Sequence, residues 1–293
     1  VTNEPSNLED KKFLVLIPGG FKPPHLGHYN LVKSYLDHPS VERVAIVIGD
    51  LDGIQVGFLP RHGKGHRLNP SEIPSRANFY ALKSIGVEQV ISISAVGSLR
   101  EEIQPLNLVV PDQLIDRTKG RVSTFFNEGI VAHVAFADPF CPVIRRELIQ
   151  CASEIGATVH SEGTYVVMEG PAFSTRAESH LYRSWGASII GMTALPEAKL
   201  AREAEICYAT IACATDYDVW REGSEDVSVE QVVANLLRNA ETSQSVLRRM
   251  IPRLPSTRNC VCISAMHNGI ITNQEMISPE VRDRLRIFLP NQQ

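Results

Sequence analysis

Residues 206–218 read ICYATIACATDYD, and the nine residues from Ile206 to Ala214 carry no charge and are mostly apolar or small. A run of this kind is typical of a strand that is buried on both faces of a sheet. It ends in TDYD, where Asp216 and Asp218 stand two apart and are expected to share one face. Ligands of open α/β sheets bind beyond the carboxyl ends of strands, where a carboxylate accepts a hydrogen bond or, when protonated, donates one. The alternative is that the two acids cap a loop or the next helix.

Strand-like and helix-like segments alternate along the chain. Apolar or β-branched runs predict strands at 13–20, 41–48, 51–59, 88–94, 106–114, 131–136, 164–168 and 188–193. Helical spacing predicts helices at 26–37, 75–85, 145–155, 176–186, 197–205 and 228–250. The sequence has no internal repeat and no low-complexity linker. We therefore expect an α/β fold, a single domain with a central mixed β-sheet flanked by helices.

The composition excludes several classes of protein. Of the 293 residues, 43% are hydrophobic and 21% are charged, as in an ordinary globular protein. The formal net charge of -4 argues against a general binder of nucleic acid or of membrane surfaces, but it is compatible with a local basic pocket for a small anion. Residues 1–12 are a polar tail without a signal-peptide core, and no apolar run is long enough to span a bilayer. We expect a cytoplasmic protein.

The cysteines support the same localisation. Four of the six are scattered through apolar or helical patterns, which indicates reduced thiols: Cys141, Cys151, Cys207 and Cys213. Cys260 and Cys262 form a lone CxC pair. Because a zinc site would need more ligands nearby in the sequence, we interpret this pair as two packed or redox-labile thiols and expect no metal site.

Several predicted strands end in small, polar or ionisable residues: RHG at 61–63, SAVGS at 94–98, GMT at 191–193 and TDYD at 215–218. Arg61 offers a planar fork for phosphate, and His62 offers a second donor. Ser94 and Ala95, just ahead of Gly97, are placed to present backbone N–H groups to an oxyanion. The alternative for Arg61 and His62 is a solvated, glycine-rich loop.

From about residue 51 to residue 288 the chain resembles the 5'-methylthioadenosine phosphorylases, relatives of the purine nucleoside phosphorylases. Seven ordered motifs carry the resemblance: FLPRHGKGH (58–66), SAVGSLREEI (94–103), DQLIDRT (112–118), ADPFCP (137–142), EGPAFSTRAES (169–179), GMTALPEA (191–198) and ATDYDVW (214–220). The resemblance implies a nucleoside-phosphorylase-like fold. It also implies phosphorolysis of 5'-methylthioadenosine to adenine and 5-methylthioribose 1-phosphate, a step of purine and methionine salvage, with inorganic phosphate as co-substrate and no metal or organic cofactor.

The resemblance also implies roles for individual residues. Phosphate is expected to bind Arg61, His62, Ser94, the Ala95 N–H and Thr193. Asp216 and Asp218 are the expected catalytic acids at the N7 and N6 edge of the purine. The expected substrate contacts are Met192 along the ribose, Phe173 on the base, Val229 and Val232 around the methylthio group, and His133 from a neighbouring subunit of a homotrimer. Without the resemblance, the ordinary interpretation of these last five residues is a position in the core.

The first fifty residues depart from this pattern. Residues 17–30 read IPGGFKPPHLGHYN, with Phe21 where the family is expected to carry a Ser or Thr hydroxyl, which Lys22 or His25 would have to replace. His25 and His28 instead resemble the HxGH motif of nucleotidyltransferases, although their later ISSTxxR signature is missing. We therefore divide the chain into a tail at 1–12, an atypical segment at 13–50 and a phosphorylase domain at 51–293, with 13–50 joined to it. Two alternative functions remain, a nucleotidyltransferase and a non-catalytic purine-binding relative.

Overall fold

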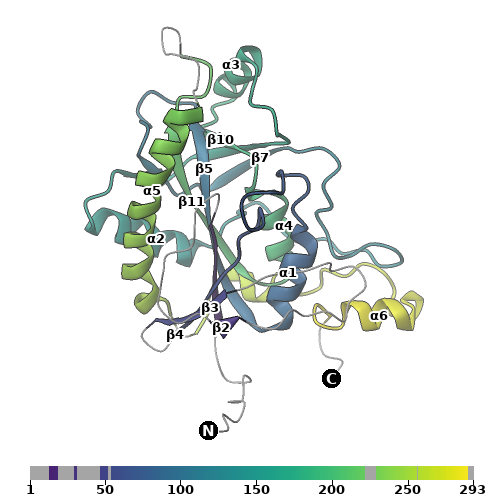
Figure 1. Cartoon of the computed structure of the whole chain (residues 1–293). Coiled ribbons are helices and arrows are strands. Elements are labelled where there is room, and N and C mark those ends of the chain that lie inside the picture. The colour runs from purple at the N-terminus through teal and green to yellow at the C-terminus, as the bar shows by residue number, and fades with distance from the viewer. Residues whose placement is uncertain are drawn as a thin grey trace.

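The computed structural model describes residues 13–18, 30–31, 47–51, 54–221, 229–255 and 257–289, with side chains at 54–221, 234–255 and 257–289. One mixed sheet of eleven strands forms the centre of this part of the chain, and helices cover both of its faces (Figure 1). The expected α/β fold with a mixed central sheet is confirmed. No helix of the described residues has the length and apolar character needed to cross a membrane.

The strands are β1 (Phe13–Pro18), β2 (Asn30–Leu31), β3 (Val47–Leu51), β4 (Ile54–Phe58), β5 (Val87–Ser98), β6 (Leu108–Val109), β7 (Gln113–Arg117), β8 (Val159–His160), β9 (Thr164–Met168), β10 (Ile189–Gly191) and β11 (Cys207–Asp216). They follow the order β2-β3-β4-β1-β5-β10-β9-β7, and β11 lies on the other side of β5, where it leads through β6 to β8. The twelve-residue strand β5 is therefore the centre of the sheet, because it pairs with β1, β10 and β11.

The pairing of β5 places several strand ends together. β1 and β11 run parallel to it, so that Pro18 lies opposite Ile93 and Asp216 lies opposite Gly97. β10 runs antiparallel to β5, with Ile189 opposite Ser98, so the residues after β10 run back along β5. The carboxyl ends of three strands and the loop after β10 thus meet at one edge of the sheet.

Helices α1 (Ser75–Ser84) and α4 (Ala194–Glu203) cover one face of the sheet, and α2 (Pro142–Glu154) and α5 (Val229–Met250) cover the other (Figure 1). α3 (Arg176–Ser184) begins at a capping box formed by Thr175 and Glu178, which fixes the start of the helix after the EGPAF loop. The remaining helical elements are α6 (Pro279–Leu285) and the 3-10 turns 251–253, 261–264 and 274–276.

Two predicted elements are wrong. Part of the helix predicted at 26–37 is the short strand β2, which pairs antiparallel with β3; the rest of that range lies outside the described residues. The strand predicted at 131–136 forms only one bridge, between Ala132 and Ile270. Its alternating pattern reflects alternating exposure on a segment that packs against the C-terminal region, away from the central sheet.

Candidate active site

Arg61 follows β4 and is almost completely buried, with 2% of its surface exposed. Its guanidinium contacts three consecutive residues of β5: Nη1 donates to Ser92 Oγ at 2.6 Å, and Nη2 donates to Ile93 O and to Ser94 Oγ, both at 3.0 Å. Nη1 also forms an ion pair with the buried carboxylate of Glu197 at 3.1 Å. The alternative of a solvated loop is therefore wrong for Arg61, although the loop is exposed from residue 64 to residue 67.

His62 is also buried, and its environment fixes its protonation state. Burial, together with the neighbouring Arg61 cation, lowers the pKa of the His62 imidazole to about 4. Its Nδ1 lies 2.9 Å from the carbonyl oxygen of Leu68, which can only accept a hydrogen bond, so Nδ1 carries the proton and Nε2 keeps a lone pair. A neutral His62 thus presents an acceptor at Nε2, whereas the sequence predicts a donor.

Ser94 and Thr193 complete a hydroxyl pair beside Arg61. Their side-chain oxygens are 3.1 Å apart, because the antiparallel course of β10 returns Thr193 to β5. Ala95, the next residue, is the exposed position in a strand that is otherwise buried or half-buried, so β5 is open at this point. The arrangement combines a buried cation, two hydroxyls and an accessible backbone at the end of one strand.

Tyr165 lies beneath this group and was not expected from the sequence. It is fully buried, and its hydroxyl has no hydrogen-bond partner within the described part of the chain. Burial raises the pKa of Tyr165 to about 12, so the hydroxyl keeps its proton and remains a donor. A Cβ atom at Gly191 would lie 2.3 Å from this hydroxyl. The Tyr165 side chain can therefore occupy this position only because residue 191, at the end of the neighbouring strand β10, is glycine.

The acidic pair lies a short distance further along β5. Asp216 Oδ1 accepts from the Asp218 N–H at 2.7 Å, and its Oδ2 accepts from the Thr215 hydroxyl at 2.6 Å. The expected loop-capping role is therefore present for Asp216. Asp218 adopts a left-handed φ of 52°, is buried, and its Oδ2 has no hydrogen-bond partner among the described residues. Burial raises the pKa of both carboxyl groups, and the charge of Asp218 adds to the increase at Asp216.

Gly97 brings the two acids close to β5. A Cβ atom at this position would lie 3.0 Å from Asp216 Oδ1 and 3.2 Å from Asp218 Cβ. Ser94, which contacts Arg61, is three residues earlier on the same strand, a separation of about 10 Å. The buried cation and the acidic pair thus lie along the same end of β5, as the sequence predicts, and the distance between them is that of a small organic molecule.

The structure locates the predicted substrate contacts to different degrees. Phe173 has 62% of its surface exposed and His133 is also exposed, so neither is a core residue. Met192 packs across Gly170, whose added Cβ would lie 2.4 Å from the sulfur atom. Val229 and Val232 lie at the start of α5, but their side chains lie outside the described part, as do Phe21, Lys22, His25 and His28.

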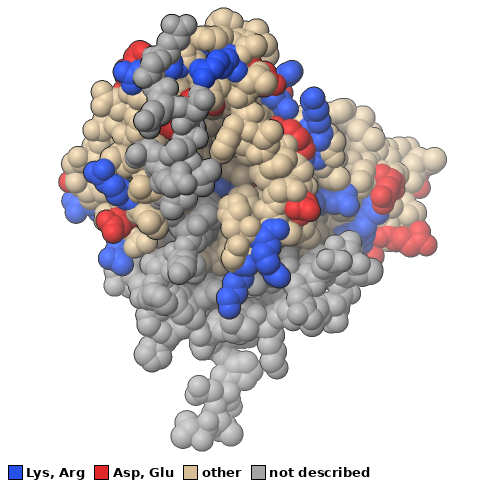
Figure 2. Space-filling model, turned by 45° about the horizontal axis from the view of Figure 1, so that its top comes forward, with Lys and Arg blue, Asp and Glu red and all other residues tan. Residues whose placement is uncertain are grey.

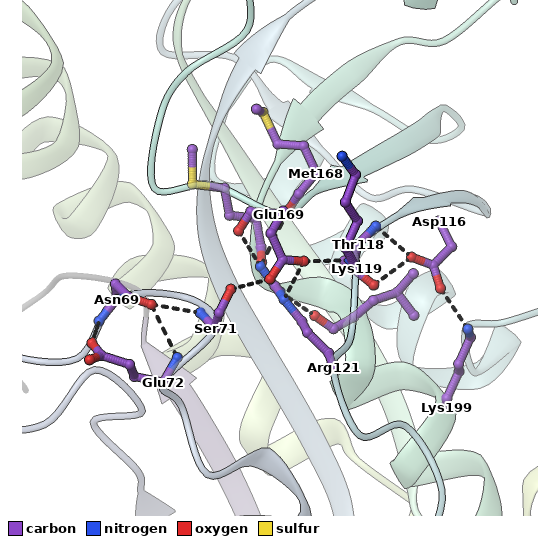
Figure 3. A network of polar contacts seen from close by, with 12 residues as sticks. Asn69, Ser71, Glu72, Asp116, Thr118, Lys119, Arg121, Met168, Glu169 and Lys199 are labelled. Carbon is purple, nitrogen blue, oxygen red and sulfur yellow. Dashed lines mark hydrogen bonds and ion pairs between the residues drawn. The ribbon is translucent and has the colours of Figure 1, made fainter.

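Arg121 joins the loops around these residues and was not expected from the sequence (Figure 3). Its Nη1 donates to the carbonyl oxygens of Met192 at 2.6 Å and Leu195 at 2.8 Å, and its Nη2 donates to the carbonyl oxygen of Glu169. Glu169 also forms an ion pair with Arg121 Nε at 3.2 Å and accepts from the Ser71 hydroxyl. One guanidinium therefore fixes the GMT and EGPAF motifs relative to each other.

No local pattern marks Arg121 or Glu197 as functional. Glu197 lies within the GMTALPEA motif, and its carboxylate accepts from Arg61 and from the Tyr208 hydroxyl at 2.8 Å. Because Glu197 lies 136 residues from Arg61 in the sequence, their ion pair could not be predicted from a local motif. The available signals were that Glu197 lies within the GMTALPEA motif and that Arg121 closely follows the DQLIDRT motif.

Comparison with known proteins agrees with this geometry. A family model described as the phosphorylase superfamily matches residues 25–252, and the chain belongs to that superfamily. The S-methyl-5'-thioadenosine phosphorylase of Geobacter sulfurreducens is 55% identical over 260 residues, which cover 88% of this chain and 90% of the relative. That of Koribacter versatilis is 53% identical over 243 residues, 83% of each chain. Within the superfamily, the chain belongs to the S-methyl-5'-thioadenosine phosphorylase family.

Solved structures have the same fold. A methylthioadenosine phosphorylase sourced from an antarctic soil metagenomic library matches with a TM-score of 0.85 at 44% identity, covering 94% of this chain and 98% of that one. Methylthioadenosine phosphorylase from Schistosoma mansoni in complex with adenine matches with a TM-score of 0.77 at 33% identity, covering 85% and 93%.

Proposed function

We propose that this protein catalyses the phosphorolysis of 5'-methylthioadenosine to adenine and 5-methylthioribose 1-phosphate. The observation that carries the proposal is the placement of a buried arginine and an acidic pair at one end of β5, in a chain that is 55% identical to a curated phosphorylase of this name. The substrates are then one nucleoside and inorganic phosphate, and the enzyme is a pentosyltransferase.

Phosphate binding follows from the group around Arg61. The guanidinium donates toward the phosphate oxygens from a position that Ser92, Glu197 and the carbonyl oxygen of Ile93 already fix. Because the Glu197 carboxylate neutralises part of its charge before phosphate arrives, Arg61 stays buried without an uncompensated cation. The hydroxyls of Ser94 and Thr193 and the N–H of Ala95 supply further donors. Such a site holds a desolvated anion against the sugar carbon that it attacks.

Departure of adenine requires a proton or a strong hydrogen bond at the purine N7. Asp216 is suited to this role because the raised pKa favours its protonated form. The unpartnered Oδ2 of Asp218 is then an acceptor for the 6-amino group, a contact that favours adenine over 6-oxopurines. As the C1'–N9 bond breaks, C1' gains oxocarbenium character, which the nearby phosphate oxygens stabilise.

The remaining parts of the proposal concern the other contacts and the assembly. Phe173 stacks on the base, Met192 contacts the ribose, and Val229 and Val232 surround the methylthio group. His133 reaches the site of a neighbouring subunit in a homotrimer. Its segment is exposed, and Val131 beside it and Ile271 opposite it have 50% and 63% of their surfaces exposed, as a subunit interface would require. The reaction needs no metal or organic cofactor and belongs to cytoplasmic purine and methionine salvage.

The comparisons favour the phosphorylase over the nucleotidyltransferase alternative. The match to the phosphorylase superfamily begins at residue 25 and so includes His25 and His28 within the phosphorylase pattern. Among the described residues on the face shown in Figure 2, basic and acidic side chains are interspersed.

The decisive experiment incubates the purified protein with 5'-methylthioadenosine, with and without inorganic phosphate, and separates the products by chromatography. We expect adenine and 5-methylthioribose 1-phosphate in equal amounts, and only when phosphate is present. Adenosine and inosine serve as comparison substrates, of which inosine is expected to react least. Adenine binding by calorimetry without any product would instead identify a non-catalytic relative and overturn the proposal.

The trimer is tested separately by sedimentation equilibrium. We expect a particle of three times the 32.4 kDa chain mass. In His133→Ala, KM for 5'-methylthioadenosine is expected to rise while the particle mass stays the same. A monomer with full activity would contradict the role of His133 in a neighbouring site.

A further inference from the structure

Four cysteines from three distant parts of the chain converge in the apolar core. They are Cys141 at the start of α2, Cys207 at the start of β11, and Cys260 and Cys262 of the CxC pair. All four are buried, and their Sγ atoms lie within 4.8 Å of one another. The sequence alone argued against a metal because the CxC pair lacks nearby ligands. The fold brings those ligands to the pair: Cys207 and Cys141 are 53 and 119 residues from Cys260 in the sequence.

The distances fit four sulfurs around a common centre better than two bonded pairs. Cys260 Sγ lies 3.3 Å from Cys207 Sγ and 3.7 Å from Cys141 Sγ, so it is shared between two partners. In a tetrahedral zinc site the Zn–S distance of about 2.3 Å places the sulfurs roughly 3.8 Å apart. Two disulfides would require about 2.05 Å between the sulfurs of each pair. All four residues are free thiols in this structure.

The surroundings support thiolate at this position. Cys141 is the residue before α2, where the backbone N–H groups of Val143 and Ile144 point to its sulfur. A helix N-terminus stabilises a thiolate, and bound metal requires its ligands deprotonated. The apolar side chains around the cluster keep water from the sulfurs.

We propose that Cys141, Cys207, Cys260 and Cys262 form a tetrathiolate site for a structural zinc ion. Four-coordinate sites made only of cysteine are structural, because no position is left open for a substrate. The ion joins the start of α2, the start of β11 and the 261–264 turn into one unit. Around the cluster these elements are also held together by apolar packing and by the hydrogen bond from the Cys141 N–H to the Tyr208 carbonyl oxygen at 2.8 Å.

The site is separate from the chemistry at β5. Cys207 and Asp216 mark opposite ends of β11, nine residues apart, which corresponds to about 30 Å along the strand. Zinc therefore acts on the stability of the fold, and its loss leaves the contacts of phosphate and purine unchanged. This separation makes the proposal testable without reference to catalysis.

The test measures metal in the full-length protein, purified under reducing conditions without chelators. Plasma mass spectrometry is expected to find one zinc per chain, and mercurial titration of the thiols is expected to release it. In Cys260→Ser/Cys262→Ser, bound zinc is expected to be lost, and Tm to fall by ~10 °C. The matched control is Cys151→Ser, which removes another buried cysteine and is expected to keep the zinc ion.

A second measurement covers the case in which the double variant does not fold. The wild-type protein, exchanged into Co²⁺, is expected to show the thiolate-to-cobalt charge-transfer bands and strong visible bands of a tetrahedral site. Two outcomes overturn the proposal. One is metal-free protein whose mass is four hydrogens lower than that of the reduced chain, which identifies two disulfides. The other is metal-free protein in which all six thiols are alkylated after denaturation.

Discussion

The two ends of β11 are built on opposite principles, although they belong to one continuous buried strand. At the Cys207 end, four thiols lie among apolar side chains, and each sulfur has another sulfur near it. At the Asp216 end, polar groups are buried with incomplete partners: Asp218 Oδ2 has none among the described residues, nor has the Tyr165 hydroxyl on the neighbouring part of the sheet.

The incomplete hydrogen bonding at the Asp216 end indicates that this end, and not the Cys207 end, binds a ligand reversibly. Burying a polar group without a partner costs free energy, and proteins keep such groups where a ligand satisfies them. Asp218 Oδ2, the Tyr165 hydroxyl and Arg61 Nε, which have no hydrogen-bond partner among the described residues, are of this kind. The cysteine end has no open position and therefore serves stability. Substitutions should therefore distinguish the two ends. Those at the Asp216 end should change activity, and those at the Cys207 end should change only stability.

The largest effect is expected for Arg61→Ala. It removes the donor that we propose for phosphate, and kcat/KM for 5'-methylthioadenosine should fall ~10³-fold, the loss typical of a group that stabilises the transition state. The buried Glu197 carboxylate is then unpaired, so the free energy of unfolding should fall by about 3–5 kcal/mol. Steady-state kinetics at varied phosphate and urea unfolding measure the two effects. Arg67→Ala, an exposed arginine of the same loop, is the control; equal losses in both variants would contradict the assignment.

Asp216→Asn should have the next largest effect. The amide donates a hydrogen bond to N7 but cannot transfer a proton, so kcat should fall ~10²-fold or more while KM for phosphate changes little. Asp283→Asn, on the exposed helix α6, is the control. An unchanged kcat would exclude Asp216 as the acid.

The pH dependence sharpens the assignment. A raised pKa keeps Asp216 protonated to higher pH, so kcat should fall as pH rises through that pKa. Asp218→Asn removes the charge that helps to raise the pKa of Asp216. In this variant the fall in kcat should therefore occur at lower pH. The profile of kcat between pH 4 and pH 9 measures the shift. A limb that stays in place would assign the titration to another group.

Arg121→Lys should reduce kcat/KM ~10-fold. A lysine cannot donate to the carbonyl oxygens of Met192, Leu195 and Glu169 at once, so the motifs that hold the ribose and the base lose their relative position. Arg146→Lys, whose side chain is largely exposed, is the control. Adenine affinity measured by calorimetry should fall together with kcat/KM. An effect on phosphate affinity alone would contradict the role of Arg121 in fixing the GMT and EGPAF motifs.

His62 gives the smallest effect at the active-site end. Its pKa of about 4 in the folded protein, against 6.5 in the unfolded chain, means that the unfolded chain binds the proton first as pH falls. The contribution of neutral His62 is therefore complete above pH 6.5 and is lost between pH 6.5 and pH 4, by about 1–2 kcal/mol after allowance for solvent screening. In His62→Gln the pH dependence of unfolding should be flatter in this range, as urea unfolding at several pH values can show.

At the cysteine end, no effect on catalysis is expected. Cys207→Ala should lower Tm while leaving kcat and both KM values at 25 °C unchanged, since about 30 Å of strand separates it from Asp216. Thermal unfolding and steady-state kinetics on the same preparation measure both. A raised KM at unchanged Tm would remove the distinction between the two ends of β11.

The amino-acid sequence by itself determined the alternation of strands and helices, the buried β11 strand and the polar residues at the strand ends. Those features are encoded locally, in hydrophobic periodicity and in motifs of a few residues. Hydrophobic periodicity gave a wrong prediction at 131–136, where the alternation belongs to a segment packed outside the central sheet. It was also wrong at Asn30–Leu31, where pairing with β3 overrides the helical spacing.

Only the tertiary structure decided which of these residues meet. Glu197 finds Arg61 across 136 residues, Arg121 joins two motifs more than 45 residues away, and the CxC pair gains two thiols from other elements. The neutral state of His62 and the unpartnered Tyr165 hydroxyl likewise depend on burial by the assembled sheet. The physical reason is that charge compensation and desolvation depend on neighbours in space, and the pairing of β5 with three strands sets those neighbours.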